Sequence, residues 1–118
     1  MVVRRGDEFL VVHRSPENGG YWHLVAGGVE QGETYADAAV RELREETELE
    51  VSVDPLDRPF VYEGIAVESF LAEAPAEWEP TLDWEHDDYR WCTREQAVEL
   101  LYWPEPRDVV RSVSSGNQ

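Results

Sequence analysis

Residues 27–49, GGVEQGETYADAAVRELREETEL, join two glycines to a helix-forming segment, and this stretch decides the fold that we expect. Thr34 and Asp37 are spaced as a capping box, which predicts that a helix begins just after Thr34. A mainly apolar stripe then recurs at helical spacing, at Ala36, Val40, Leu43 and Thr47. The pattern predicts a helix that runs to about Thr47 and packs this stripe against the rest of the protein.

Three glutamates, Glu42, Glu45 and Glu46, occupy a sector of the same helix next to the apolar stripe. Carboxylates at positions i, i+3 and i+4 repel one another, but their oxygens are also hard ligands that suit Mg²⁺ or Mn²⁺. A solvated acidic helix face is the alternative interpretation of such a cluster. The preceding glycines favour the metal site, because glycine lets backbone groups approach a ligand closely.

The whole stretch resembles the Nudix box, G-x5-E-x7-R-E-U-x-E-E-x-G-U, in which U is apolar. The fixed positions matched over the 23-residue span are Gly27, Glu33, Arg41, Glu42, Leu43, Glu45, Glu46 and Leu49. One position departs from the pattern, because Glu48 stands where the box has its late glycine. Glycine there would suit a left-handed residue at the helix end, and glutamate can adopt that conformation at a cost of roughly 1 kcal/mol. We therefore expect an altered helix end and no loss of chemistry.

The resemblance implies the Nudix fold, an α+β architecture with a mixed β-sheet sandwiched between α-helices (α/β/α). It also implies hydrolysis of a nucleoside diphosphate linked to another moiety, with Mg²⁺ or Mn²⁺ as the cofactor. The implied metal ligands, or groups that position the attacking water, are the carboxylates of Glu42, Glu45 and Glu46 and a carbonyl of Gly27 or Gly28. Arg41 and Glu33 are implied to orient these carboxylates.

Two further signals lie outside the box. Residues 85–91, EHDDYRW, resemble the E-H-x-x-Y-[RK]-W segment of several Nudix subgroups, in which the glutamate reaches the metal or the attacking water. This predicts that Glu85 is the general base or a metal ligand, the alternative being one more acid in an acidic loop. Arg14 ends an expected strand where similar proteins often place a phosphate-binding arginine, the alternative being an ordinary surface arginine.

Aromatic residues in the acidic segment 73–88 offer a substrate-binding surface. Trp78 and Trp84 lie in this expected loop and could stack on a flat base or pterin, and Tyr21 and Trp22 could also stack on a base. Packing within the protein is the more frequent role of such residues and is the alternative.

The rest of the chain predicts strands on both sides of the box helix. Residues 2–5 and 9–14 flank a turn at 6–8, and the further expected strands are 21–26, 60–62, 65–72 and 89–92. Thr93 and Gln96 form a second potential capping box, which opens a helix through about residue 101, and a short helix is expected near 107–113. We expect one Nudix domain over 1–113 and a frayed tail over 114–118.

Composition excludes several classes of protein. The 118 residues carry 26 acidic and ten basic side chains, a formal charge of -16, and all ten basic residues are arginine. Lysine chemistry is therefore excluded, and nucleic acid or anionic membranes would be repelled. A single cysteine excludes an internal disulfide and a multi-thiolate metal site. No membrane span or secretory signal is recognisable, so we expect a cytoplasmic protein.

These observations predict a Mg²⁺-dependent pyrophosphohydrolase that cleaves a phosphoanhydride bond by attack of water on phosphorus. The substrate class that we expect is a nucleotide or pterin triphosphate or a dinucleoside polyphosphate, because the 85–91 segment recurs in hydrolases of dinucleoside tetraphosphates and dihydroneopterin triphosphate. The proline typical of the ADP-ribose subgroup is absent near residues 64–66. The alternatives are an ADP-ribose or sugar-nucleotide pyrophosphatase and a non-catalytic ligand-sensing module, although sensors typically lose box glutamates.

Overall fold

A mixed sheet forms the centre of the computed structural model, which describes residues 1–56, 60–62 and 64–113. Its strands are β1 (Val2–Arg5), β2 (Glu8–Arg14), β3 (Trp22–His23), β4 (Asp54–Pro55), β7 (Phe70–Glu73) and β8 (His86–Cys92). Strand β2 runs antiparallel to β1, β3 and β8, whereas β1 runs parallel to β7, and β7 is antiparallel to β4. Strand β2 thus joins β8, which lies far along the chain, to the early strands β1 and β3 in one sheet.

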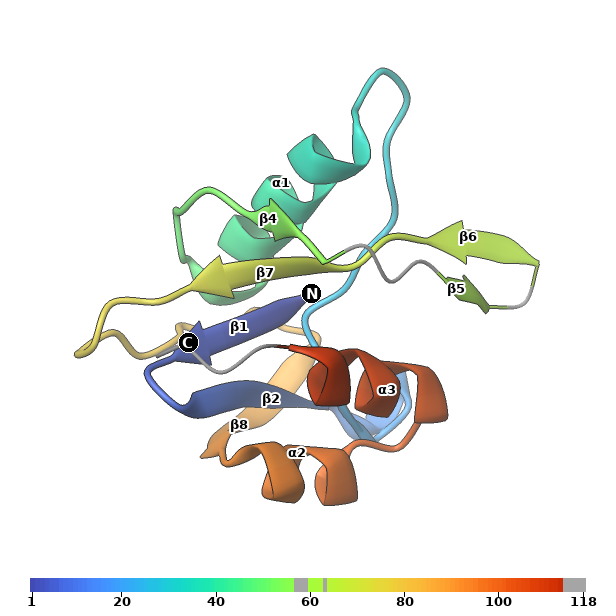
Figure 1. Ribbon diagram of the computed structural model, residues 1–118. Coiled ribbons are helices and arrows are strands. Elements are labelled where there is room, and N and C mark those ends of the chain that lie inside the picture. Colours follow the sequence, from blue (N-terminus) through green and yellow to red (C-terminus); the bar gives the residue numbers. More distant parts are fainter. Residues whose placement is uncertain (57–59, 63, 114–118) are drawn as a thin grey trace.

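Two layers of helices cover the two faces of this sheet (Figure 1). The helices are η1 (Pro16–Asn18), α1 (Tyr35–Thr47), α2 (Arg94–Leu100) and α3 (Pro104–Ser112). Alternate residues of β2 point to opposite faces: Phe9 and Val11 pack in a cluster with Val110 of α3, whereas Leu10 and Val12 pack in a cluster with Leu43 of α1. The expected α+β architecture, with helices on both faces of a mixed sheet, is confirmed.

The local signals around the helices match the structure. Thr34 and Asp37 form the expected capping box of α1, and Thr93 and Gln96 form that of α2. Glu48 adopts the expected left-handed conformation, with φ 66° and ψ 16°, and its N–H donates to the carbonyl of Arg44. Helix α3 begins earlier than the predicted residue 107, because Pro104 occupies its first turn, where proline is pre-organised for a helix. The expected tail over 114–118 lies outside the described residues.

Two strand predictions need correction. The single strand expected over 65–72 is two strands, because β6 (Ile65–Val67) pairs with β5 (Phe60–Tyr62) in a separate two-stranded sheet, while β7 joins the central sheet. The strand expected over 21–26 is limited to β3, because the chain beyond His23 leaves β2 and buries Leu24 and Val25 in the core.

Strand β8 begins at His86, three residues earlier than expected, and pairs along the full length of β2 from Phe9–Cys92 to Arg14–His86, with an irregularity between His13 and Arg14. The residues just before β8 are therefore brought beside the end of β2. Across the described ranges, none of the helices has the length and apolarity needed to cross a lipid bilayer.

Candidate active site

An ion-pair network around Arg41 organises the start of the box. Its guanidinium donates from Nε to Glu33 Oε2 at 2.8 Å, from Nη2 to Glu33 Oε1 at 3.0 Å and from Nη1 to Glu42 Oε1 at 2.7 Å. The Nη2 group also donates to the carbonyl of Gly28 at 2.8 Å, and Nη1 lies 3.3 Å from Glu45 Oε2. The hydrogen bonds between the two side chains lower the pKa of Glu33 and raise the pKa of Arg41. Arg41 and Glu33 are placed where they orient the helix carboxylates relative to the glycine segment.

Gly27 is needed because the Glu42 carboxyl group lies directly against its backbone. A Cβ atom at residue 27 would overlap the carboxyl carbon and both oxygens of Glu42. The requirement is steric rather than conformational, since the φ angle of Gly27 is not positive. The glycine therefore brings a backbone segment and a carboxylate together at one point.

Glu46 is the buried carboxyl group of the site. Its side chain is only 5% exposed, and burial, the hydrogen bond with Glu42 and the negative charge of Glu42 raise its pKa to about 9. A buried acid with a strongly raised pKa beside a second carboxylate is typical of functional sites. A cation bound between the two carboxylates would relieve both the desolvation and the repulsion.

The acidic segment before β8 closes over the C-terminal half of α1. The backbone N–H of Asp83 donates to the carbonyl of Glu46 at 3.3 Å, and Thr81 N–H donates to the carbonyl of Thr47 at 3.0 Å. His86 Nδ1 lies 2.7 Å from Asp83 Oδ1, and His86 Nε2 lies 3.7 Å from Glu46 Oε1. Asp83 and His86 are site residues that the sequence reasoning missed, since nothing local links them to Glu46.

Glu85 and Arg14 lie together at the end of β2. Arg14 Nη2 is 3.6 Å from Glu85 Oε2, and the backbone N–H of Ser15 donates to the carbonyl of Glu85 at 2.9 Å. Arg14 Nε is held by the carbonyl of Asn18 at 2.6 Å. The two charged residues that sequence reasoning selected outside the box are thus neighbours, and His86, which follows Glu85, lies close to Glu46.

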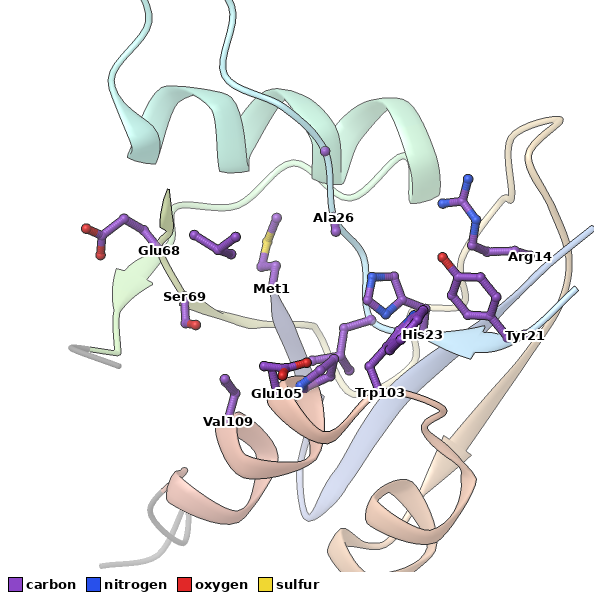
Figure 2. Close-up of a pocket in the computed structure, with 14 residues that line it drawn as sticks. Met1, Arg14, Tyr21, His23, Ala26, Glu68, Ser69, Trp103, Glu105 and Val109 are labelled. Atoms are coloured by element: carbon purple, nitrogen blue, oxygen red, sulfur yellow. The ribbon is translucent and has the colours of Figure 1, made fainter. Parts of the chain in front are cut away.

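A cavity of about 330 Å³ opens beside these groups (Figure 2). Its walls are mainly apolar and aromatic, and its polar groups come from several elements; among the lining residues are Arg14, Tyr21, His23, Ala26, Gly27, Glu68, Trp103 and Glu105. A second cavity of about 390 Å³ shares Ala26, Gly27 and Glu68 with the first and reaches Glu42. The first cavity therefore adjoins the one that Glu42 of the box lines.

Of the aromatic residues that the sequence suggested for stacking, Tyr21 lines the 330 Å³ cavity, whereas Trp78 and Trp84 lie elsewhere. Trp78 packs against Trp91, with ring centroids 6.2 Å apart, and Trp84 is 79% exposed. Neither lines the 330 Å³ cavity, whereas Tyr21 and Trp103 do, at a centroid distance of 6.0 Å. Trp103 was not predicted because it directly precedes α3, which is far from the box in the sequence. The two segments come together only because both pack on the central sheet.

The described ranges contain no group of three or more His, Cys, Asp or Glu side chains arranged as a ready metal site. In this arrangement the Arg41 guanidinium occupies oxygens of Glu42 and Glu45. The donor set nevertheless fits a hard divalent cation, because Glu42 and Glu46 share one site against the Gly27 backbone and both offer oxygen ligands. Glu45 is half-exposed and could join them by turning away from Arg41.

Residues 1–113 match the family described as NUDIX domain, and the chain therefore belongs to the Nudix hydrolase family, whose members generally use divalent metals. The chain is 33% identical to an octanoyltransferase of Myxococcus xanthus over 98% of this chain and 35% of that protein. It is 34% identical to the NAD-capped RNA hydrolase NudC of Haemophilus influenzae (strain PittEE) over 86% of this chain and 40% of that protein. The chain thus spans well under half the length of these curated relatives.

Solved structures of family members show the same fold. The Ap4A hydrolase of C. elegans, in a binary complex, is 27% identical and superposes with a TM-score of 0.81 over 93% of this chain and 89% of that chain. The E. coli dihydroneopterin triphosphate pyrophosphohydrolase gives a TM-score of 0.83 over 99% and 92%, at 23% identity. The membership in the Nudix family that the box implied is confirmed.

Proposed function

We propose that this chain is a Mg²⁺-dependent pyrophosphohydrolase that cleaves a phosphoanhydride bond in a nucleotide-like triphosphate or a dinucleoside polyphosphate. One observation carries the proposal: Glu42 of the box lines a cavity that adjoins a second one, which combines aromatic walls with Arg14. A flat ring fits the aromatic part, and a phosphate chain can extend from it toward the carboxylates and the arginine.

Glu42, Glu45, Glu46 and the Gly27 carbonyl would hold the cation. Bound Mg²⁺ supplies charge neutralisation between these carboxylates and the phosphates, a lower pKa for water, and stabilisation of charge on the phosphoryl oxygens.

The chain's own residues supply orientation and proton transfer. Arg41 fixes Glu42 and the glycine segment through its bonds to Glu42 and Gly28. Arg14 offers a positive charge to the phosphates at the edge of the cavity. Glu85 lies next to Arg14 and is one third exposed, so its carboxylate can accept a proton from the attacking water.

The NudC relatives favour a second candidate, a dinucleotide with the pyrophosphate linkage of NAD or ADP-ribose. An NAD cap carries that linkage between two nucleosides, so the same carboxylates and cavity could serve it. The formal charge of -16 opposes extended contacts with an RNA chain, and we propose a small phosphorylated substrate without nucleic-acid or membrane partners. We also propose a cytoplasmic location.

A substrate panel with Mg²⁺ tests these candidates. The panel contains nucleoside triphosphates, dihydroneopterin triphosphate, diadenosine tetraphosphate, NAD and ADP-ribose, and phosphate-containing products are measured with and without EDTA. We expect metal-dependent turnover, which Glu46→Gln reduces at least ~100-fold and the exposed control Glu99→Gln leaves unchanged. The highest kcat/KM on NAD or ADP-ribose would favour the second candidate, and binding without turnover would favour a ligand-sensing module.

A further inference from the structure

The floor of the 330 Å³ cavity carries a carboxylate that the proposed chemistry does not use. Glu105 is half-buried in the first turn of α3 and lines the cavity together with Trp103 and Val109 (Figure 2). Throughout the part of the chain that the structure describes, no hydrogen bond or ion pair involves the Glu105 side chain. An acceptor in an apolar and aromatic wall is therefore available to a ligand.

A second unpaired polar atom lies beneath the wall of this cavity. His23 lines the same cavity, and its Nδ1 atom is buried without a hydrogen-bond partner in the described residues. Burial lowers the pKa of His23 to about 4, so the ring is neutral at pH 7. Because this atom lies beneath the cavity surface, the unpaired acceptor that a ligand can reach is the Glu105 carboxylate.

The cavity has two ends of different character. Ala26 and Gly27 connect it with Glu42, and Arg14 lies at its edge, so the phosphates belong there. Figure 2 shows α3, which carries Glu105, on the opposite side of the cavity from α1. The base of a nucleotide whose phosphates reach the box would therefore lie against Trp103 and Glu105.

Resting on the proposed function, we infer that Glu105 selects substrates whose ring presents a 2-amino-4-oxopyrimidine edge, as guanine and pterins do. A carboxylate has two acceptor oxygens and no donor. The ring N–H and the 2-amino group of this edge are adjacent donors, so both oxygens are satisfied by a bidentate, charge-assisted pair. Adenine presents a ring nitrogen acceptor beside its amino group, and that lone pair would face the carboxylate.

Monophosphates test the inference without turnover. In EDTA, we expect GMP to shift the NMR signal of the Trp103 indole and to bind at least about 10-fold more tightly than IMP or AMP, because IMP lacks the 2-amino group. Neopterin monophosphate distinguishes the two sources of the edge, since tighter binding than GMP identifies a pterin and weaker binding identifies guanine. Glu105→Gln should abolish the preference for GMP over IMP and AMP, whereas the exposed control Glu99→Gln should retain it.

Glu105 also lies in the first turn of α3, where a negative charge stabilises a helix. If Glu105→Gln did not fold, the comparison of GMP with IMP in the unaltered protein would still decide the question. Equal affinities for GMP and AMP, an unchanged preference in a folded Glu105→Gln protein, or no perturbation of Trp103 would overturn the inference. Metal-dependent hydrolysis of the substrate panel would be unaffected by these outcomes, so failure of the two proposals can be distinguished.

Discussion

Replacement of Glu46 by glutamine should change the pH dependence of stability in the metal-free protein. The Glu46 carboxyl has its pKa raised to about 9 by burial and by Glu42, compared with about 4.5 in the unfolded chain. Between these values the folded state binds a proton that the unfolded state releases, so the stability of the unaltered protein falls as pH rises. Glutamine resembles the protonated acid and does not titrate.

The magnitude follows from proton linkage. One proton difference changes the free energy of unfolding by about 1.4 kcal/mol per pH unit, which gives about 4 kcal/mol between pH 5 and pH 8 as the upper value. The 5% exposure of the Glu46 side chain leaves little solvent screening to reduce it. We therefore expect Glu46→Gln to match the unaltered protein near pH 5 and to exceed its stability clearly at pH 8.

Urea unfolding in EDTA at pH 5, 6.5 and 8 measures this difference. Glu45→Gln is the matched control, because it removes the same charge from the same helix at a half-exposed position. Its effect should vary much less with pH. A constant difference between Glu46→Gln and the unaltered protein at all three pH values would refute the assignment of Glu46 as a buried acid with a raised pKa.

Four other substitutions test the geometry of the site. Gly27→Ala should lower kcat about 100-fold, because the new methyl group displaces the Glu42 carboxyl group, and normal turnover would contradict that contact. Glu85→Gln should lower kcat by about 10²- to 10⁴-fold with little change in KM, and an active variant would move the general base to the helix. Arg14→Gln should raise KM about 10- to 100-fold while kcat changes less, as initial rates over substrate concentration will show. His23→Leu should raise the free energy of unfolding by about 1 kcal/mol, since an unpaired buried nitrogen is removed; a less stable variant would indicate a hidden partner.

The box and its helix were predictable because their signals are local. The capping residues Thr34 and Asp37 set the start of α1, and the left-handed position at its end falls on Glu48 because the helix must terminate there even without glycine. Glu42 and Glu46 are spaced so that they lie on one side of the helix, and this holds whatever the helix packs against. These contacts join residues that are close in the sequence, so the sequence alone is enough to predict them.

The cavity was not predictable because distant segments build it. Tyr21 follows β2, whereas Trp103 directly precedes α3 and Glu105 lies in its first turn, and their meeting depends on how α3 packs on the sheet. An aromatic residue in an acidic loop, such as the exposed Trp84, looks the same in the sequence whether or not it binds a substrate. Only the packing of the folded chain shows which aromatic residues line a cavity. The division of 65–72 into β6 and β7 likewise reflects pairing with different partners rather than any change in local propensity.

The pairing of β2 with β8 has a consequence for biosynthesis. The ribosome releases β2 well before its antiparallel neighbour β8, in which Cys92 faces Phe9, emerges from the exit tunnel. Until then one long edge of β2 has unpaired backbone groups beside the apolar side chains of Leu10 and Val12, which is the kind of strand that associates with other chains. Pairing across such a sequence separation is also slow, so this edge stays open to association with other chains for longer than the edges paired by neighbouring segments. The same pairing delivers Glu85 to Arg14, and the acidic residue therefore reaches its place only when the nascent sheet is completed.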